Sequence, residues 1–124
     1  MFKKLIAINI LCFFLLQDGI FIYSQSINAH HFEDEIKLGA KVFDLRIDFW
    51  YKLGHIHSAQ RLKLDDPNLG RSIYKLNREN EILLYDEFGT NSEFLFKEMQ
   101  RLGFKKVFWL HGGFTAWKED SLPF

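Results

Sequence analysis

Residues 86–92 (DEFGTNS) bring together the side chains of this chain that are best suited to chemistry. An apolar run at 82–85 precedes them and predicts a buried strand, and a helical pattern follows them. A short loop between a strand and a helix N-terminus turns several backbone N–H groups toward one point, an arrangement that binds anions. The sequence therefore predicts an anion-binding loop. Its candidate site residues are Asp86, Glu87, Phe88, Gly89, Thr90, Asn91 and Ser92.

A second polar pair ends another predicted strand, at 41–45. In open α/β sheets, the carboxyl ends of the strands carry functional residues. Asp44 could act there as a general acid or base, or it could brace the 86–92 loop or pair with Arg46. We favour the structural role for Asp44.

Two pairs of histidines could ligate a metal ion. His30 and His31 are adjacent, whereas His55 and His57 would share one face of an extended segment because side chains alternate along it. No third ligand lies near His30 and His31 in the sequence, and a zinc site needs three or four ligands. The His55 and His57 pair is disfavoured by the structural role that a family resemblance, given below, implies for His55. We therefore predict neither a metal nor another cofactor, with His30 and His31 in a solvated helix start.

The elements that must position these residues alternate between helical and strand patterns. A three-layer α/β domain is expected, with a mostly parallel sheet of about four or five strands and helices on both faces. Asn28 should cap the first helix, with Phe32 and Ile36 facing inward and His31 as a further candidate for that face. Ser92 should cap the central helix, and Gly103 should end it. The expected helices span 29–37, 48–53, 69–76, 92–102 and 114–119, and the expected strands span 41–45, 82–85 and 105–110.

Several inward-facing residues follow from these helical patterns. Phe94, Leu95, Met99 and Leu102 share one side of the central helix, and Ile73, Tyr74 and Leu76 should face inward from 69–76. The aromatic residues of 48–53 could form a binding patch, although packing at the edge of the core is the safer interpretation. Asp48 could cap that segment.

Four segments, in the right order and spacing, resemble the rhodanese-like (sulfurtransferase) family. The chain resembles that family over residues 26–124. There the resemblance implies a rhodanese-like domain, a structural role for His55, and a nucleophilic residue at the start of the 86–92 loop. The matching segments are VFDLR at 42–46, GHI at 54–56 with Ala59, the 86–92 loop, and LHGGFTAW at 110–117 followed by Leu122-Pro123.

The chain departs from the family pattern at the nucleophile. Asp86 stands where the resemblance places a cysteine, and Asn91 stands where an arginine is common. The one cysteine of the chain is Cys12. A persulfide requires a thiolate, so the resemblance in fold does not carry sulfur transfer with it. A carboxylate at position 86 should itself accept the loop N–H bonds and so weaken the binding of external anions.

Residues 1–25 predict a signal peptide. Lys3 and Lys4 precede an apolar run at 5–16, and small Ser24 stands before the expected cut. The run is shorter than the roughly 20 residues that cross a bilayer, so no stable membrane span is expected after leader removal. We expect an exported protein, periplasmic or secreted, whose mature part holds no cysteine.

Composition limits the remaining function classes. The formal net charge is +0, so no basic field draws the protein to nucleic acid. The preferred hypothesis is a catalytically inactive rhodanese-like module that binds an unknown protein partner or small ligand in the cell envelope. The alternative is an enzyme that uses Asp86 with Asp44 or His55, or an accessory subunit in sulfur transfer. A relic without a selected function at this loop remains a third possibility.

Overall fold

The computed structural model describes residues 25–124, so the expected leader and Cys12 lie outside the described residues. Five parallel strands form one sheet in the order β1-β5-β4-β2-β3. The expected α/β architecture is confirmed. The strands are β1 (Ser26–Ile27), β2 (Lys41–Asp44), β3 (Gln60–Arg61), β4 (Ile82–Tyr85) and β5 (Val107–Leu110).

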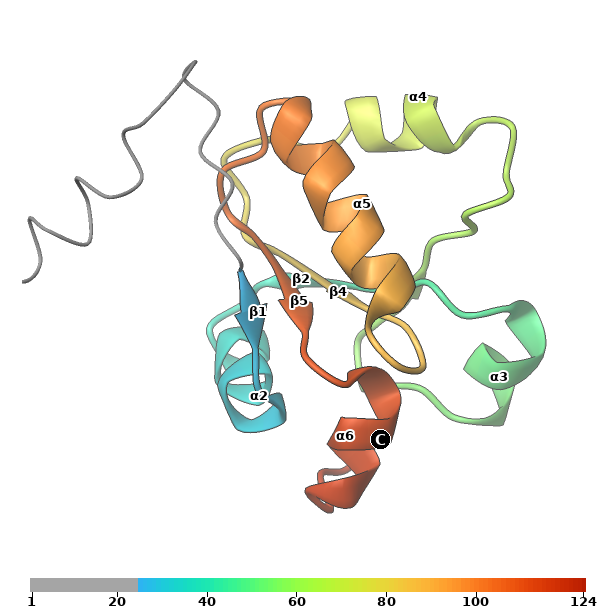
Figure 1. Cartoon of the computed structure of the whole chain (residues 1–124), viewed down its shortest axis with the longest axis vertical. Helices are drawn as coiled ribbons and strands as arrows, with labels where there is room; N and C mark the ends of the chain where they lie inside the picture. Colours follow the sequence, from blue (N-terminus) through green and yellow to red (C-terminus); the bar gives the residue numbers. More distant parts are fainter. Residues whose placement is uncertain (1–24) are drawn as a thin grey trace, which may run out of the picture.

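Helices cover both faces of this sheet, which gives three layers (Figure 1). Residues of α4 and α5 pack on one face, and residues of α2 and α6 pack on the other. Helix α3 contributes no buried residue and lies beyond the edge of the sheet (Figure 1). The helices are α2 (Ala29–Lys37), α3 (Asp48–Leu53), α4 (Leu69–Tyr74), α5 (Thr90–Arg101) and α6 (Gly113–Glu119).

Strand β4 lies at the centre of the sheet, and all four of its residues are buried. Because strand side chains alternate between faces, Ile82 and Leu84 pack with the α5 side, whereas Leu83 and Tyr85 pack with the α2 and α6 side. Burial on both faces explains the continuous apolar run. The carboxyl end of β4 therefore presents Asp86 at the edge of a rigid core.

The first helix follows its sequence signals. The Asn28 side chain accepts a hydrogen bond from the backbone N–H of His31 at 2.9 Å, so the predicted N-cap is confirmed. Phe32 is fully buried. The alternative that His31 faces inward was wrong, and its predicted solvated placement is confirmed, because its ring is exposed and contacts Glu35 at 3.0 Å, one turn along the helix.

The central helix differs from its predicted start and face. Helix α5 begins at Thr90, two residues before the predicted position, and Gly89 in the left-handed conformation (φ 101°) precedes it. Leu95, Phe96 and Met99 are the apolar side chains that α5 buries against the sheet. Phe94 and Leu102 are exposed, so their predicted burial was wrong. Leu95 and Met99 are four residues apart, so the helix can bury them together with Phe96 instead of Phe94.

Two smaller predictions were also wrong. Tyr74 is exposed at the end of α4, while Ile73 beside it fills the core. Asp48 is the first residue of α3 rather than its cap, and its carboxylate pairs with Lys52 at 2.7 Å. Ile47 holds the cap position without a side-chain hydrogen bond.

Candidate functional site

The carboxylate of Asp86 occupies the centre of its own loop. Oδ1 accepts the backbone N–H of Gly89 at 2.9 Å and the hydroxyl of Ser92, and Oδ2 accepts the backbone N–H of Asn91 at 3.0 Å. The residue is only 6% exposed. The hydrogen-bond donors of the loop thus converge on one point as predicted, and the group that they bind is the protein's own Asp86 carboxylate.

Local geometry explains why the loop closes in this way. Gly89 has a φ of 101°, which side-chain-bearing residues rarely adopt, and a Cβ there would lie 3.1 Å from the ring of Trp109. The turn carries the chain directly into α5, whose N-terminus favours a negative charge. Ser92 is buried in the first turn, where its hydroxyl donates to Asp86 instead of capping the helix.

The backbone of the loop rests on the start of α6. The carbonyl oxygens of Asp86 and Glu87 accept the backbone N–H groups of Phe114 at 2.8 Å and Thr115 at 3.1 Å. Gly113 has a φ of 64°, and a Cβ there would lie 2.5 Å from the carbonyl group of Glu87. The glycine pair therefore permits close backbone packing beside the loop.

A buried ion pair supports the site from the end of β2. The Asp44 carboxylate is fully buried and accepts the Arg46 guanidinium at 2.7 Å, the Arg46 backbone N–H at 2.9 Å and the Tyr85 hydroxyl at 2.6 Å. Burial, together with the Asp44 charge, raises the pKa of Tyr85. The pKa of Arg46 is also raised: burial opposes its charge, but the bonds to Asp44 and the Asp44 charge outweigh burial. These two shifts keep the Arg46 guanidinium charged and the Tyr85 hydroxyl neutral, which suits a structural brace.

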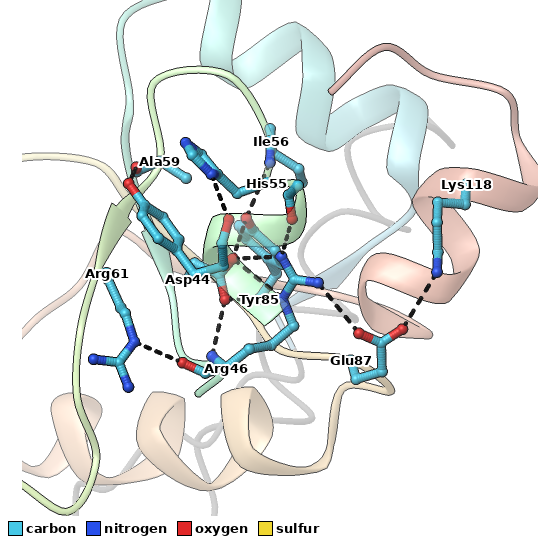
Figure 2. A network of polar contacts seen from close by, with 11 residues as sticks. Asp44, Arg46, His55, Ile56, Ala59, Arg61, Tyr85, Glu87 and Lys118 are labelled. Atoms are coloured by element: carbon cyan, nitrogen blue, oxygen red, sulfur yellow. Dashed lines mark hydrogen bonds and ion pairs between the residues drawn. The ribbon is translucent and has the colours of Figure 1, made fainter. Parts of the chain in front are cut away.

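Arg46 extends this brace to the loop. Its guanidinium donates to the Gly54 carbonyl at 2.7 Å and to the Glu87 carboxylate at 3.3 Å. Glu87 lies between Arg46 and Lys118, whose ammonium is 3.6 Å away (Figure 2). Thr115 also contacts Glu87 at 3.1 Å. A chain of alternating charges thus runs from Asp44 to the surface.

His55 contacts Tyr51 at the end of α3 rather than the Asp86 carboxylate. Its Nδ1 contacts the Tyr51 carbonyl at 2.8 Å, and its ring stacks on the Tyr51 ring with 3.9 Å between centroids. His57 is exposed. Within residues 25–124, no group of three or more His, Cys, Asp or Glu side chains is placed to hold a metal ion. No helix in the same range is long and apolar enough to cross a membrane.

A cavity of about 610 Å³ opens beside the loop. Its lining combines Arg46, Glu87 and Lys118 with the apolar side chains of α3, of the loop and of the C-terminal segment. Sequence reasoning did not identify Lys118 or Phe124 as site residues. No pattern in the sequence indicates these two residues, because they line the cavity only once α6 and the C-terminus pack beside the loop.

Comparison with known proteins identifies relatives of this chain. Residues 28–120 match the family described as "Rhodanese-like domain". Thiosulfate sulfurtransferase GlpE of Coxiella burnetii is 29% identical over 97 residues, which cover 78% of this chain and 89% of that protein. A rhodanese-related protein from Thermoplasma volcanium superposes with a TM-score of 0.71 at 24% identity, covering 80% of this chain and 95% of the other. A thiosulfate sulfurtransferase from Pseudomonas aeruginosa gives a TM-score of 0.65 at 25% identity over 82% of this chain and 19% of that chain.

Proposed function

Because the chain belongs to the rhodanese-like domain family but has aspartate at the expected nucleophile position, we propose that it is a catalytically inactive, ligand- or partner-binding member. The chain is homologous to sulfurtransferases. The observation that carries the proposal is the Asp86 carboxylate, which accepts bonds from Gly89, Asn91 and Ser92. The loop donors that would hold an incoming anion are already engaged.

Electrostatics support the same conclusion. A thiosulfate or phosphate ion that approached the loop would meet the like charge of Asp86 and would have to displace its hydrogen bonds. Two like charges in contact repel strongly where little water separates them. Anion binding at this loop should therefore be weak.

The position of the one cysteine is the second support. Sulfur transfer through a covalent persulfide needs a thiolate, and Cys12 is the only source of a thiol in the sequence. Cys12 belongs to the segment that we propose is removed as a leader. The mature protein would then lack the nucleophile entirely, and it would act in the cell envelope as a periplasmic or secreted protein.

An enzyme that uses Asp86 as its nucleophile is the alternative. Both carboxylate oxygens are engaged in hydrogen bonds, and the side chain is buried, which disfavours attack on a substrate. An aspartyl-phosphate mechanism would also need a cation, whereas the backbone N–H groups of the loop favour an anion. Loss of an assigned activity in Asp86→Asn, with the fold intact, would favour this alternative.

The direct test of inactivity is sulfur transfer from thiosulfate to cyanide by the purified protein. We expect no turnover from the unmodified chain and none from Cys12→Ser. Asp86→Cys restores a thiol at the end of β4, and turnover by that variant would show that only the nucleophile is missing. Turnover by the unmodified chain that survives in Cys12→Ser would overturn the proposal.

Export has its own test. Expression in a bacterial host followed by fractionation should place the protein in the periplasm or medium. Mass spectrometry of the N-terminus should then identify the cut near residue 25. An intact N-terminus in the cytoplasmic fraction would contradict export without affecting the assignment of Asp86.

A further inference from the structure

The cavity beside the loop has the size and lining of a small-molecule site. At about 610 Å³ it falls within the range of roughly 300 to 1,000 Å³ that is typical of ligand pockets. Apolar groups from four separate segments make most of its wall: Trp50 and Leu53 of α3, Phe88 of the loop, Phe114 of α6, and the C-terminal Phe124. Such a wall suits an apolar ligand body rather than a hydrated inorganic ion.

The apolar wall is also left largely uncovered. Trp50, Leu53, Phe88 and Phe124 are all exposed, although each borders the same cavity. Phe124 packs edge-to-face on Phe114, with 5.0 Å between centroids, and so extends the aromatic surface. A concentration of exposed apolar side chains around one hollow marks a binding site more often than scattered single residues do.

The polar groups in the wall define the ligand head. The Arg46 guanidinium donates hydrogen bonds to Asp44, Gly54 and Glu87, and the side chain is almost fully buried. Glu87 accepts Arg46 and Thr115 and lies near Lys118. The Arg46 guanidinium is therefore already bonded to other groups of the protein, and each carboxylate oxygen of Glu87 already accepts one hydrogen bond.

Lys118 differs from these two residues. Its ammonium carries three donors but approaches Glu87 only at 3.6 Å, beyond ordinary hydrogen-bond distance. Its side chain remains 47% exposed, and the ammonium lies 5.1 Å above the ring of Phe114. Among the described residues of the wall, Lys118 is therefore the cation that can turn to an anionic group at the mouth while its aliphatic stem lines the cavity.

We propose that this cavity binds a small amphipathic carboxylate, a proposal that rests on the inactive binding role above. The apolar body of the ligand lies against Trp50, Phe88 and Phe114. The ligand carboxylate accepts a hydrogen bond from the Lys118 ammonium at the cavity mouth. Binding forms no covalent bond and leaves the Asp86 loop unchanged. The ligand class thus differs from the inorganic anions that the occupied loop would repel.

Titration calorimetry at neutral pH with decanoate as the probe tests this assignment on the purified full chain. The Lys118→Met variant should bind decanoate roughly fivefold more weakly, since a partly exposed charge contact contributes on the order of 1 kcal/mol. Lys97→Met is the matched control, because Lys97 is 48% exposed and pairs with Glu93 at 3.1 Å on α5. Its affinity should equal that of the unmodified protein.

A second variant tests the apolar wall. Phe88→Ser should weaken decanoate binding about tenfold, because the ligand then buries less apolar surface. Phe94→Ser is its control: both rings are largely exposed, at 71% for Phe88 and 64% for Phe94, but Phe94 does not line the cavity. Neither substitution removes a core contact, so both variants should fold.

The outcomes separate this inference from the proposed function. Absence of decanoate binding, or equal losses in the variants and their controls, would overturn the inference. Decanol binding as tightly as decanoate would overturn the role of Lys118. A sulfur-transfer assay on the same sample tests the proposed catalytic inactivity separately from carboxylate binding. Absence of turnover would support inactivity whatever the titration shows. Turnover would overturn the proposed function itself.

Discussion

Replacement of Asp86 by alanine should destabilise the protein strongly. The substitution removes the acceptor for two buried donors, Gly89 N–H and Ser92 O–H, and for the partly buried Asn91 N–H. A hydrogen bond to a charged group contributes about 1.5 to 3 kcal/mol, and water can compensate part of the loss at Asn91. We therefore expect the free energy of unfolding to fall by about 3 to 5 kcal/mol in Asp86→Ala.

Urea unfolding followed by circular dichroism measures this loss. With a slope of about 1 to 3 kcal/mol per M, the midpoint should fall by at least about 1 M. Asp86→Asn keeps one acceptor oxygen and should lose less. The matched control is Asp66→Ala, which removes an exposed side-chain acceptor, 2.8 Å from the Asn68 N–H, and should cost under about 1 kcal/mol. A loss in Asp86→Ala no larger than in this control would refute the inferred role of the carboxylate.

Three further predictions concern residues around the loop. Gly113→Ala should lower the free energy of unfolding by at least about 3 kcal/mol in urea unfolding, because its Cβ would collide with the Glu87 carbonyl group. The control is Gly39→Ala, where φ is 98° but no atom lies within 4 Å of the added Cβ, and it should cost about 1 to 2 kcal/mol. Arg46→Met should cost about 3 kcal/mol in urea unfolding because Asp44 stays buried without its cation, and a loss below about 1 kcal/mol would contradict this. Burial, followed by the hydrogen bond and the charge of Glu35, raises the pKa of Glu81 to about 7. Its protonated form therefore contributes stability that is full below its ordinary pKa and is lost as pH rises through about 7. Glu81→Gln should reduce the fall in the free energy of unfolding between pH 5 and pH 8, measured by urea unfolding, by about 1 kcal/mol after allowance for solvent screening. The exposed control Glu79→Gln should leave this fall unchanged.

The parallel sheet and its central unit were predictable from local pattern. The apolar run of β4 and the helical pattern after it indicate strand, loop and helix, and the polar pair Asp44 and Arg46 marks the end of a neighbouring strand. The two-residue strands β1 and β3 were not predicted. Strands this short carry no periodicity, and only pairing with β5 and β2 creates them.

The start and the buried face of α5 depended on tertiary contacts. Ser92 is a good N-cap by type, but its hydroxyl instead donates to Asp86, and the helix begins earlier after Gly89. Phe94 and Phe96 are equally apolar, so the sequence alone did not indicate which of them the sheet would cover. The surface cavity was beyond sequence reasoning, because its wall joins α3, the loop, α6 and Phe124 across the fold.

The central claim is that Asp86 serves as the anion of its own loop. The measurement that tests it most directly is the urea midpoint of the unmodified protein and of Asp86→Ala, each with and without thiosulfate at matched ionic strength. An anion at ten times its dissociation constant stabilises a protein by about 1.4 kcal/mol. We predict that thiosulfate raises the midpoint of Asp86→Ala, where the loop donors are free, and leaves the unmodified protein unchanged. Equal stabilisation of both proteins would contradict the claim.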